Sequence, residues 1–230
     1  MLTRVAVVVP AHDEERLLPA SLAAISRAAR RVAPVPVDVF VVADTCTDST
    51  VDIARAAGAH AVPVRARDVG FARAAGMAAA LAEGSGWLAT TDADCRVGAD
   101  WLARQLRYAA AGYGVVVGTV RVEDWTGWSP ALAPAYHEAY RARLRGRGHR
   151  HIHGANLGMS AAAYMAAGGF AAAALAEDIA FVTAARRAGL RIAYATDLPV
   201  VTSTRRHARA RGGFSDYLRR LEADLARRTG

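Results

Sequence analysis

The sequence contains no lysine, only two cysteines and no apolar run long enough to span a membrane. Because the phosphate-binding loop of P-loop nucleotide triphosphatases needs a lysine, its absence excludes that class of protein. The cysteines, Cys46 and Cys95, are too few for a disulfide framework, and neither belongs to a CxxC pair that would indicate zinc or redox chemistry. We expect both thiols to be reduced.

The N-terminal stretch MLTRVAVVVPAHDEE passes from a short apolar run into acidic residues without a cleavage-type signal. We therefore expect a cytoplasmic protein. With 230 residues, of which 53% are hydrophobic, the chain can bury a full core. This length predicts a single domain over residues 1–230.

The basic charge comes from arginine alone: all 29 basic residues are arginines, and the formal net charge is +8. With so much alanine beside it, this usage is typical of coding bias, so charge alone predicts no partner. We expect no nucleic-acid partner. Contact with the inner face of a membrane stays open for two clusters of the second half, which are Arg141, Arg143, Arg145, Arg147 and Arg150, then Arg205, Arg206, Arg209 and Arg211.

The first hundred residues alternate short β-branched runs with alanine-rich stretches, which is typical of βαβ units. This pattern predicts an α/β fold with a mostly parallel central sheet flanked by helices. The expected strands are Val5–Val9, Val37–Val42, His60–Val64 and Trp87–Thr91. The expected helices between them are Glu14–Arg31, Asp48–Gly58 and Gly70–Ala82.

After Asp94 the pattern becomes mixed and indicates a substrate-facing half. The expected helices are Ala99–Ala111, Ala135–Arg145, Ala161–Ala167, Asp178–Ala188 and a polar helix from Phe214 to the end. The expected strands are Val115–Val122, Arg191–Ala195 and a strand or loop at Gly154–Ser160.

Carboxylates follow three of the expected strands: Glu14 comes after the first, Asp44 ends the second, and Asp92 and Asp94 follow the fourth. In open parallel sheets the ligand crevice lies beyond the carboxyl ends of the strands, so these acids should converge there. Two aspartates that flank one residue of an extended chain share a face and can ligate a divalent cation. The alternative is an ordinary acidic turn with Asp94 as a helix cap.

Other α/β nucleotide and ester chemistries fit less well. The turn after the first strand reads AHDEE, whose acids would repel the pyrophosphate of a dinucleotide. No GxSxG pentapeptide of an α/β hydrolase occurs. A nucleotidyltransferase would need a glycine-rich basic loop at the position of AHDEE, so it is a weak alternative.

The ordered segments VVVPAHDEE, VVADTCTDST, VGFARAAG, TTDADC, GANLGMS, GGF and AEDIAF closely resemble the family 2 glycosyltransferases of GT-A fold. The resemblance covers roughly residues 5–203. It implies a hexosyltransferase-type enzyme that is inverting, depends on a divalent metal and uses a nucleotide-diphosphate sugar. It also implies a nucleotide-sugar-binding half at 1–98 and an acceptor-binding half at 99–230. An inactive binding module is disfavoured because Asp44, Asp92, Asp94 and Asp178 are all present.

The resemblance implies a role for each motif on the donor side. Pro10, Ala11 and Glu14 would surround the base and ribose, and Asp44 would accept a hydrogen bond from the base. A helix cap is the alternative for Asp44, but Asp48 is the better cap candidate, which leaves Asp44 free for a ligand. Further donor contacts are implied for Arg73, Asp92 and Ala93. Ala74 departs from the family pattern, in which asparagine is usual at this position.

The metal and catalytic roles follow from the same resemblance. Asp94, with Asp92, would hold Mn²⁺ or Mg²⁺ on the diphosphate. Asp178 would be the general base and Glu177 its orienting partner. The alternative for both is an acidic first turn favoured by the helix dipole.

On the acceptor side, the resemblance implies that Gly154, Ala155 and Asn156 form the floor of the site, and glycan and lipid-linked acceptors stay open. A late loop would contact the diphosphate as a lid, or form a basic surface, through Ser203, Arg205, Arg206 and His207.

The histidines of HRHIH share a face if they lie on a strand, and such a face can bind zinc. No fourth ligand is evident, so we expect a solvated loop for His149 and His151 and a wall of the acceptor site for His153. Trp125 and Trp128 could stack on a sugar ring, but we favour packing anchors.

Overall fold

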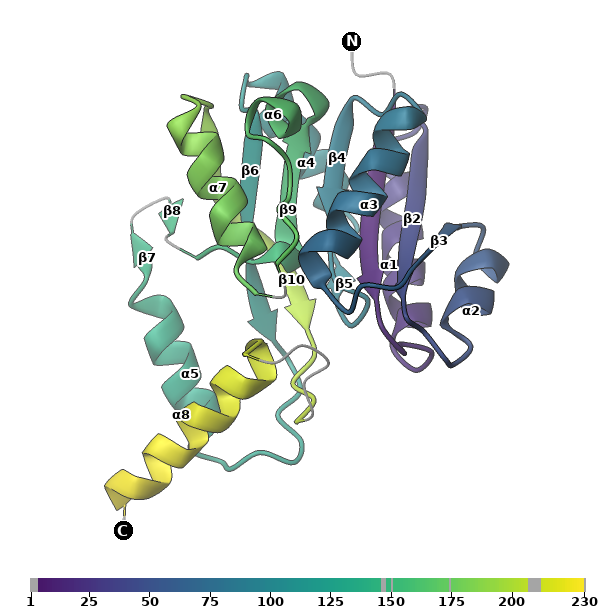
Figure 1. The fold of residues 1–230 in the computed structure, drawn as a ribbon. Helices are drawn as coiled ribbons and strands as arrows, with labels where there is room; N and C mark the ends of the chain where they lie inside the picture. The colour runs from purple at the N-terminus through teal and green to yellow at the C-terminus, as the bar shows by residue number, and fades with distance from the viewer. Residues whose placement is uncertain (1–3, 146–147, 150, 174, 207–211, 230) are drawn as a thin grey trace.

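A mixed sheet forms the centre of the computed structural model, which describes residues 4–145, 148–149, 151–173, 175–206 and 212–229 (Figure 1). Within these residues the sheet has eight strands in the order β3-β2-β1-β4-β9-β6-β10-β5. The expected α/β fold is confirmed. The sheet is parallel in its first half and mixed in its second half.

The parallel part contains β1 (Val5–Ala11), β2 (Val37–Asp44), β3 (His60–Val64) and β4 (Trp87–Thr90). Every residue of β1 is buried, because helices cover both faces of this central strand. The helices between these strands are α1 (Leu18–Arg30), α2 (Thr50–Ala56) and α3 (Val69–Ala82).

Helix α1 starts four residues later than expected. Pro19 stands in its first turn, where a residue without an N–H is tolerated. Residues 14–17 instead form a turn in which the Glu14 carbonyl accepts from the Leu17 and Leu18 amides. This turn keeps Glu14 at the end of the sheet.

In the second half, β9 (Leu157–Ser160) runs antiparallel to both β4 and β6 (Val115–Val122). Strand β10 (Ile192–Thr202) pairs in parallel with β6, and β5 (Arg96–Val97) closes the edge in antiparallel. Strand β10 is longer than expected, because a register shift between Tyr194 and Pro199 lets it continue past the Asp-Leu-Pro segment. The remaining helices beside the sheet are α4 (Trp101–Ala110), α6 (Ala161–Ala166) and α7 (Glu177–Arg187).

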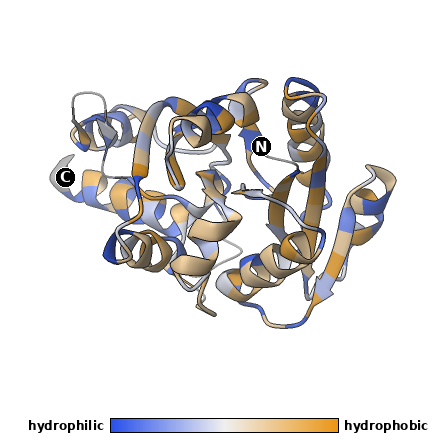
Figure 2. Cartoon of the chain, turned by 90° about the horizontal axis from the view of Figure 1, so that it is seen from above, coloured by the Kyte–Doolittle hydropathy of each residue, from blue (hydrophilic) through white to orange (hydrophobic). Residues whose placement is uncertain are grey.

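Two apolar cores lie on opposite faces of the sheet. One contains Ile25 of α1 and Leu102 of α4, and the other contains Met77 of α3 and Phe181 of α7. Figure 2 shows mostly hydrophobic strands, whereas the surrounding helices alternate hydrophobic and hydrophilic residues. This distribution is expected when each helix buries one stripe against the sheet.

A third apolar cluster joins α5 (Leu132–Arg141) to α8 (Phe214–Thr229), which lie together beyond the carboxyl ends of β6 and β10 (Figure 1). Both tryptophans of the mid-chain loop belong to it, and the Trp128 indole donates to the Thr204 carbonyl at 2.7 Å. The packing role of Trp125 and Trp128 is therefore confirmed.

Helix α5 begins earlier than expected and ends at Arg141. The short strands β7 (Leu144–Arg145) and β8 (Gly148–His149) pair just after it. Among the described residues, no helix has the length and apolar character that crossing a membrane requires.

Candidate functional site

A cleft of about 600 Å³ opens at the carboxyl ends of the parallel strands. It gathers residues from β1 at one end of the sequence to the start of α8 at the other. Fifteen of the predicted site residues line it, namely Pro10, Ala11, Glu14, Asp44, Arg73, Asp92, Ala93, Asp94, His153, Gly154, Ala155, Glu177, Asp178, Ser203 and Arg205.

The strand order explains why the acidic residues converge. Strands β2, β1 and β4 are neighbours and parallel, so the segments that follow them leave the sheet at one edge. Asp44, Glu14 and Asp92 therefore lie along one wall of the cleft, although up to 78 positions separate them in the sequence. The convergence predicted from the strand ends is confirmed.

Asp44 is not free, contrary to expectation. Its Oδ1 accepts from the amides of Ala66 and Arg67 at 2.8 and 2.9 Å, and its Oδ2 accepts from the Asp68 amide at 2.9 Å. Burial would raise the pKa of Asp44, but these amides outweigh it and hold the pKa below its usual value. Asp44 thus fixes the loop after β3, and it lines the cleft while doing so.

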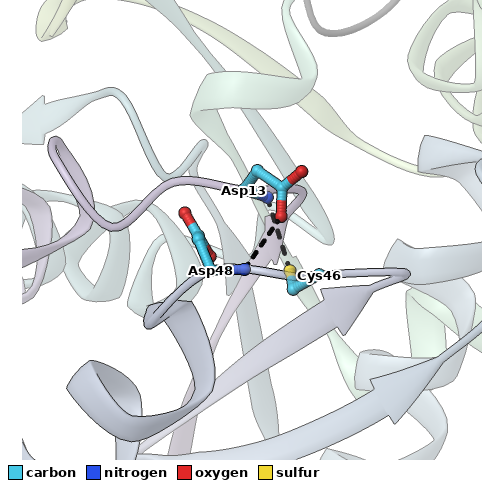
Figure 3. Close-up of side chains that lie close together, drawn as sticks. All are labelled: Asp13, Cys46 and Asp48. Atoms are coloured by element: carbon cyan, nitrogen blue, oxygen red, sulfur yellow. Dashed lines mark hydrogen bonds between the residues drawn. The ribbon is translucent and has the colours of Figure 1, made fainter.

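Asp13, Cys46 and Asp48 lie close together where β1 and β2 end (Figure 3). The Asp13 carboxylate accepts from the Thr47 amide at 2.7 Å and from the Asp48 amide at 3.4 Å. Asp48 in turn accepts from the Thr50 amide at 3.0 Å beside the start of α2, but the N-cap of this helix is Ser49 and not Asp48 as expected. These bonds tie the two strand exits together and account for the cluster.

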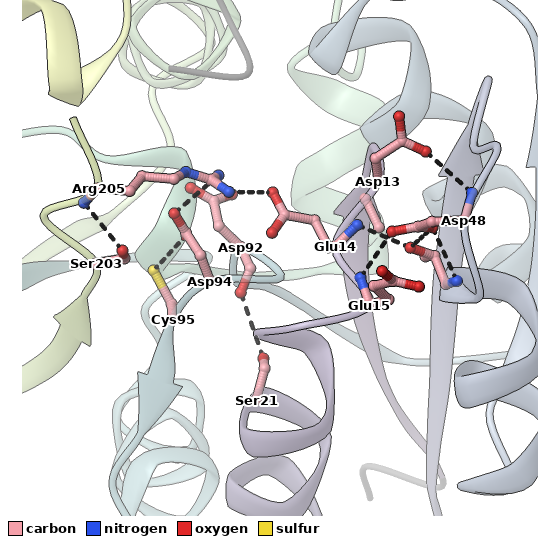
Figure 4. A network of polar contacts seen from close by, with 12 residues as sticks. Asp13, Glu14, Glu15, Ser21, Asp48, Asp92, Asp94, Cys95, Ser203 and Arg205 are labelled. Carbon is pink, nitrogen blue, oxygen red and sulfur yellow. Dashed lines mark hydrogen bonds and ion pairs between the residues drawn. The ribbon is translucent and has the colours of Figure 1, made fainter. Parts of the chain in front are cut away.

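The paired aspartates after β4 lie opposite an arginine from the other end of the chain (Figure 4). Arg205 donates to Glu14 Oε1 at 2.6 Å and lies 3.0 Å from Asp94 Oδ2. Burial raises the pKa of Asp94, and Arg205 opposes this rise. Asp94 does not cap the helix that follows, because the N-cap of α4 is Asp100.

Asp92, Asp94 and Cys95 form a group whose side chains lie close enough to hold a metal ion. The Cys95 thiol is buried and donates to Asp94 Oδ1 at 3.5 Å, so the two carboxylates supply the ligand atoms. Two carboxylates in an open cleft fit a hard cation such as Mn²⁺ or Mg²⁺, which prefers oxygen ligands.

Arg73 connects the two acidic motifs of the cleft. The residue is 3% exposed, and its guanidinium is hydrogen-bonded both to Asp92 and to Glu177. Gly154 packs on it so closely that a Cβ there would lie 2.6 Å from the guanidinium carbon. The partners of Arg73 in the structure are therefore two acids of the cleft.

Asp178 lies in the first turn of α7 with its side chain at the cleft. Its Oδ2 accepts from the Gly154 amide at 2.7 Å. Ala176, just before the helix, has a φ of 64°, which turns the chain sharply into α7. The neighbouring Glu177 is 4% exposed, and burial raises its pKa despite the opposing charge of Arg73.

The expectation of a solvated loop at His149 and His151 is wrong, since both side chains are 5% exposed. His149 Nε2 lies 3.0 Å from the Val117 carbonyl, and His151 Nε2 lies 2.9 Å from the Tyr140 carbonyl. His151 also stacks on the Tyr140 ring at 3.6 Å. No metal-binding group in the described part of the chain contains a histidine. His153 lines the cleft, and burial lowers its pKa to about 3.

Asn156 does not line the cleft, although the sequence analysis placed it on the floor of an acceptor site. It is fully buried, its Oδ1 accepts from the Trp101 indole at 2.9 Å, and its amide donates to the carbonyls of Thr119 and Leu198. This residue ties β6 to β10 from behind the site.

Arg206 does not line the cleft either. It pairs with Glu222 at 2.8 Å and covers the Trp128 ring, with its guanidinium carbon 4.3 Å from the ring centre. Its assignment to the diphosphate lid is therefore withdrawn. His207, Arg209 and Arg211 lie outside the described residues.

Several cleft residues escaped the sequence analysis. Arg67 and Asp68 follow β3, and the strand-end argument would have found them had it been extended to that strand. Leu175 and the start of α8, including Phe214, also line the cleft. They carry no local signal, because their position depends on the packing of α8 against α5.

Comparison with known proteins places this geometry in context. Residues 6–167 match the model of glycosyl transferase family 2. No curated protein matches the chain.

The solved structures similar to this chain share its fold at low sequence identity. One is S. aureus TarS 1–349 in complex with UDP-GlcNAc, with 16% identity, a TM-score of 0.69, and 96% of this chain and 66% of that chain covered. Another is the mannosyltransferase PcManGT from Pyrobaculum calidifontis with GDP-Man and Mn²⁺, with 21% identity, a TM-score of 0.68, and 99% and 65% covered. A third is glucosyl-3-phosphoglycerate synthase from Mycobacterium tuberculosis with Mn²⁺, UDP and its product, with 20% identity, a TM-score of 0.64, and 97% and 77% covered. This chain thus spans about two thirds of the length of the first two.

Proposed function

The chain belongs to glycosyl transferase family 2, and on that premise we propose that it transfers a sugar from a nucleoside-diphosphate donor to an acceptor hydroxyl. The observation that carries the proposal is the Arg73 bridge. One buried guanidinium holds Asp92, which is a candidate metal ligand, and Glu177, which is next to the candidate base. Donor and acceptor chemistry are thereby set at a fixed separation within one cleft.

We assign the donor to the side of the cleft formed by β1, β2 and β4. Pro10 and Ala11 lie at the end of β1, and Asp44 with the loop it holds lines the cleft at the end of the neighbouring strand β2. Asp92 and Asp94 would hold Mn²⁺ or Mg²⁺, which supplies positive charge for the departing diphosphate when bound. Three neighbours bear on this assignment, because they were crystallised with UDP-GlcNAc, with GDP-Man and Mn²⁺, and with UDP and Mn²⁺.

We assign the acceptor to the side of the cleft formed by His153, Gly154 and Ala155. Asp178 takes the proton from the acceptor hydroxyl, whose oxygen attacks the anomeric carbon while the bond to the diphosphate oxygen breaks. This single displacement inverts the configuration at that carbon. The Gly154 amide holds one Asp178 oxygen, which orients the carboxylate for proton transfer.

The test is a calorimetric panel of UDP, GDP and dTDP, each measured with Mn²⁺ and with EDTA. We expect at least one nucleotide to bind only with Mn²⁺, and Asp94→Asn to abolish that binding while the thermal transition stays near that of the wild type. The matched control is Asp52→Asn on α2, whose side chain is 85% exposed and which does not line the cleft. Nucleotide affinity that is unchanged in Asp94→Asn would refute the metal role.

A further inference from the structure

Arg205 is a charged residue of the described cleft to which the proposed chemistry assigns no role. Its guanidinium bridges Glu14 and Asp94, which come from the exits of β1 and β4 (Figure 4). The side chains of Glu14 and Asp94 are 5% and 13% exposed and that of Arg205 is 26% exposed, so both ion pairs are largely buried. Charges in such surroundings interact more strongly than surface charges do.

The backbone on both sides of Arg205 is anchored. The Thr204 carbonyl accepts from the Trp128 indole, and its hydroxyl donates to the Asp124 carbonyl at 2.5 Å. Arg206 is held by Glu222 on α8. The long side chain of Arg205 can therefore change partners without movement of the segment that carries it.

The acids around Arg205 outnumber the cations. Two guanidinium groups, those of Arg205 and Arg73, pair with three acids, which are Glu14, Asp92 and Asp94. Arg73 also forms an ion pair with Glu177. A metal ion at the aspartates would compete with Arg205 for Asp94. A diphosphate would instead offer the guanidinium a bidentate partner and relieve that competition.

We infer that Arg205 is the resident counter-ion of the metal site, which opposes the binding of a bare divalent cation and favours the joint binding of cation and nucleoside diphosphate. This inference rests on the proposed function. It assigns one side chain two positions: on Asp94 and Glu14 in the free protein, and on the diphosphate in the donor complex. Metal and nucleotide then bind cooperatively, and each raises the affinity for the other by the same factor.

Removing the guanidinium should therefore strengthen the binding of Mn²⁺ alone and weaken the binding of Mn²⁺ in the presence of nucleotide. In Arg205→Gln, Mn²⁺ alone should bind more tightly, by about tenfold, because its competitor for Asp94 is gone. In the same variant, Mn²⁺ with nucleotide should bind more weakly by a similar factor. Arg205→Lys keeps the charge without the fork of donors, so it should bind Mn²⁺ alone as the wild type does.

Electron paramagnetic resonance of free Mn²⁺ measures two dissociation constants of Mn²⁺, one without nucleotide and one with saturating UDP or GDP. The matched control is Arg104→Gln, which removes a surface arginine that pairs with Asp197, does not line the cleft and should change neither constant. Circular dichroism checks that each variant is folded.

A variant Arg205→Gln that binds Mn²⁺ alone no more tightly than the wild type, or that keeps full cooperativity with nucleotide, would overturn the inference. If the wild type binds no Mn²⁺ with any nucleotide, the proposed function itself fails. The two failures are therefore distinguishable.

Discussion

The Arg73 bridge allows a sharp test of the site's framework. In Arg73→Met the buried Glu177 loses its cation, and breaking a buried pair in this way costs about 3–5 kcal/mol. Asp92 contributes less, because its side chain is 37% exposed and water can replace the guanidinium. The free energy of unfolding should therefore fall by about 3–5 kcal/mol, which is a large share of the stability of a domain this size.

A second substitution identifies the cause. Arg73→Met combined with Glu177→Gln removes the unpaired charge and should recover a large part of the loss, which denaturant titration measures directly. The control is Arg104→Met, whose surface pair with Asp197 should be worth less than about 1 kcal/mol. A loss below about 1 kcal/mol in Arg73→Met, or no recovery in the double variant, would refute the reasoning.

The same variant has a pH signature. Burial already raises the pKa of Glu177 in the folded protein, and loss of Arg73 should raise it further. A carboxyl whose folded pKa exceeds its unfolded pKa supports stability at low pH and loses that contribution as pH rises through the folded pKa. The deficit of Arg73→Met should thus be largest at neutral pH and shrink on acidification, and Glu177→Gln should abolish this trend.

Two further predictions concern the remaining acids of the cleft. Asp178→Asn should slow Mn²⁺-dependent release of nucleoside diphosphate from a nucleotide sugar by about 10²–10⁴-fold with donor affinity unchanged, and a normal rate would reduce Asp178 to a helix-start acid. Asp44→Asn should lower the free energy of unfolding by about 1–3 kcal/mol, because the amides of residues 66–68 lose a charged acceptor. The same variant should bind free nucleoside diphosphate more weakly. Calorimetry that finds the nucleotide affinity unchanged would confine Asp44 to its structural role.

The acidic part of the cleft could be predicted from the sequence because its signals are local. Asp44, Asp92 and Asp94 stand directly at strand ends, and a parallel sheet brings neighbouring strand ends together whatever the loops do. The Glu177–Asp178 pair at the start of α7 was expected only from the family resemblance, because its local pattern fits an ordinary acidic first turn equally well.

The direction in which a side chain points was not predictable where distant packing decides it. Asn156 belongs to the same 3₁₀ turn as Gly154 and Ala155, yet it points into the core, where carbonyls 37 and 42 residues away accept from its amide. Arg205 and Arg206 are adjacent in the sequence, but Arg205 points into the cleft and pairs with Glu14, whereas Arg206 pairs with Glu222 on α8. Burial of His149 depends on the Val117 carbonyl of β6, which no local pattern reveals.

Backbone strain shows why the acidic motifs alone do not make this site. The four non-glycine residues with positive φ among the described residues are Asp13, Thr45, Arg67 and Ala176, and each lines the cleft or adjoins a residue that does. Such conformations cost about 1–3 kcal/mol each and persist only where the surroundings fix them. Here the Asp44 carboxylate holds the Arg67 amide, and the Val64 carbonyl accepts from the Thr45 amide at 2.9 Å.

The hydrogen bonds that keep these turns in place are the same ones that position the acids. Asp13 binds the amides after β2, while Asp44 binds the amides after β3, so each strand exit is fixed by a carboxylate from the neighbouring one. A shift in one exit would therefore move the next. The cleft at these exits consequently depends on acids that hold the backbone as much as on acids that face the cleft. Asp44 holds the amides after β3 and also lines the cleft.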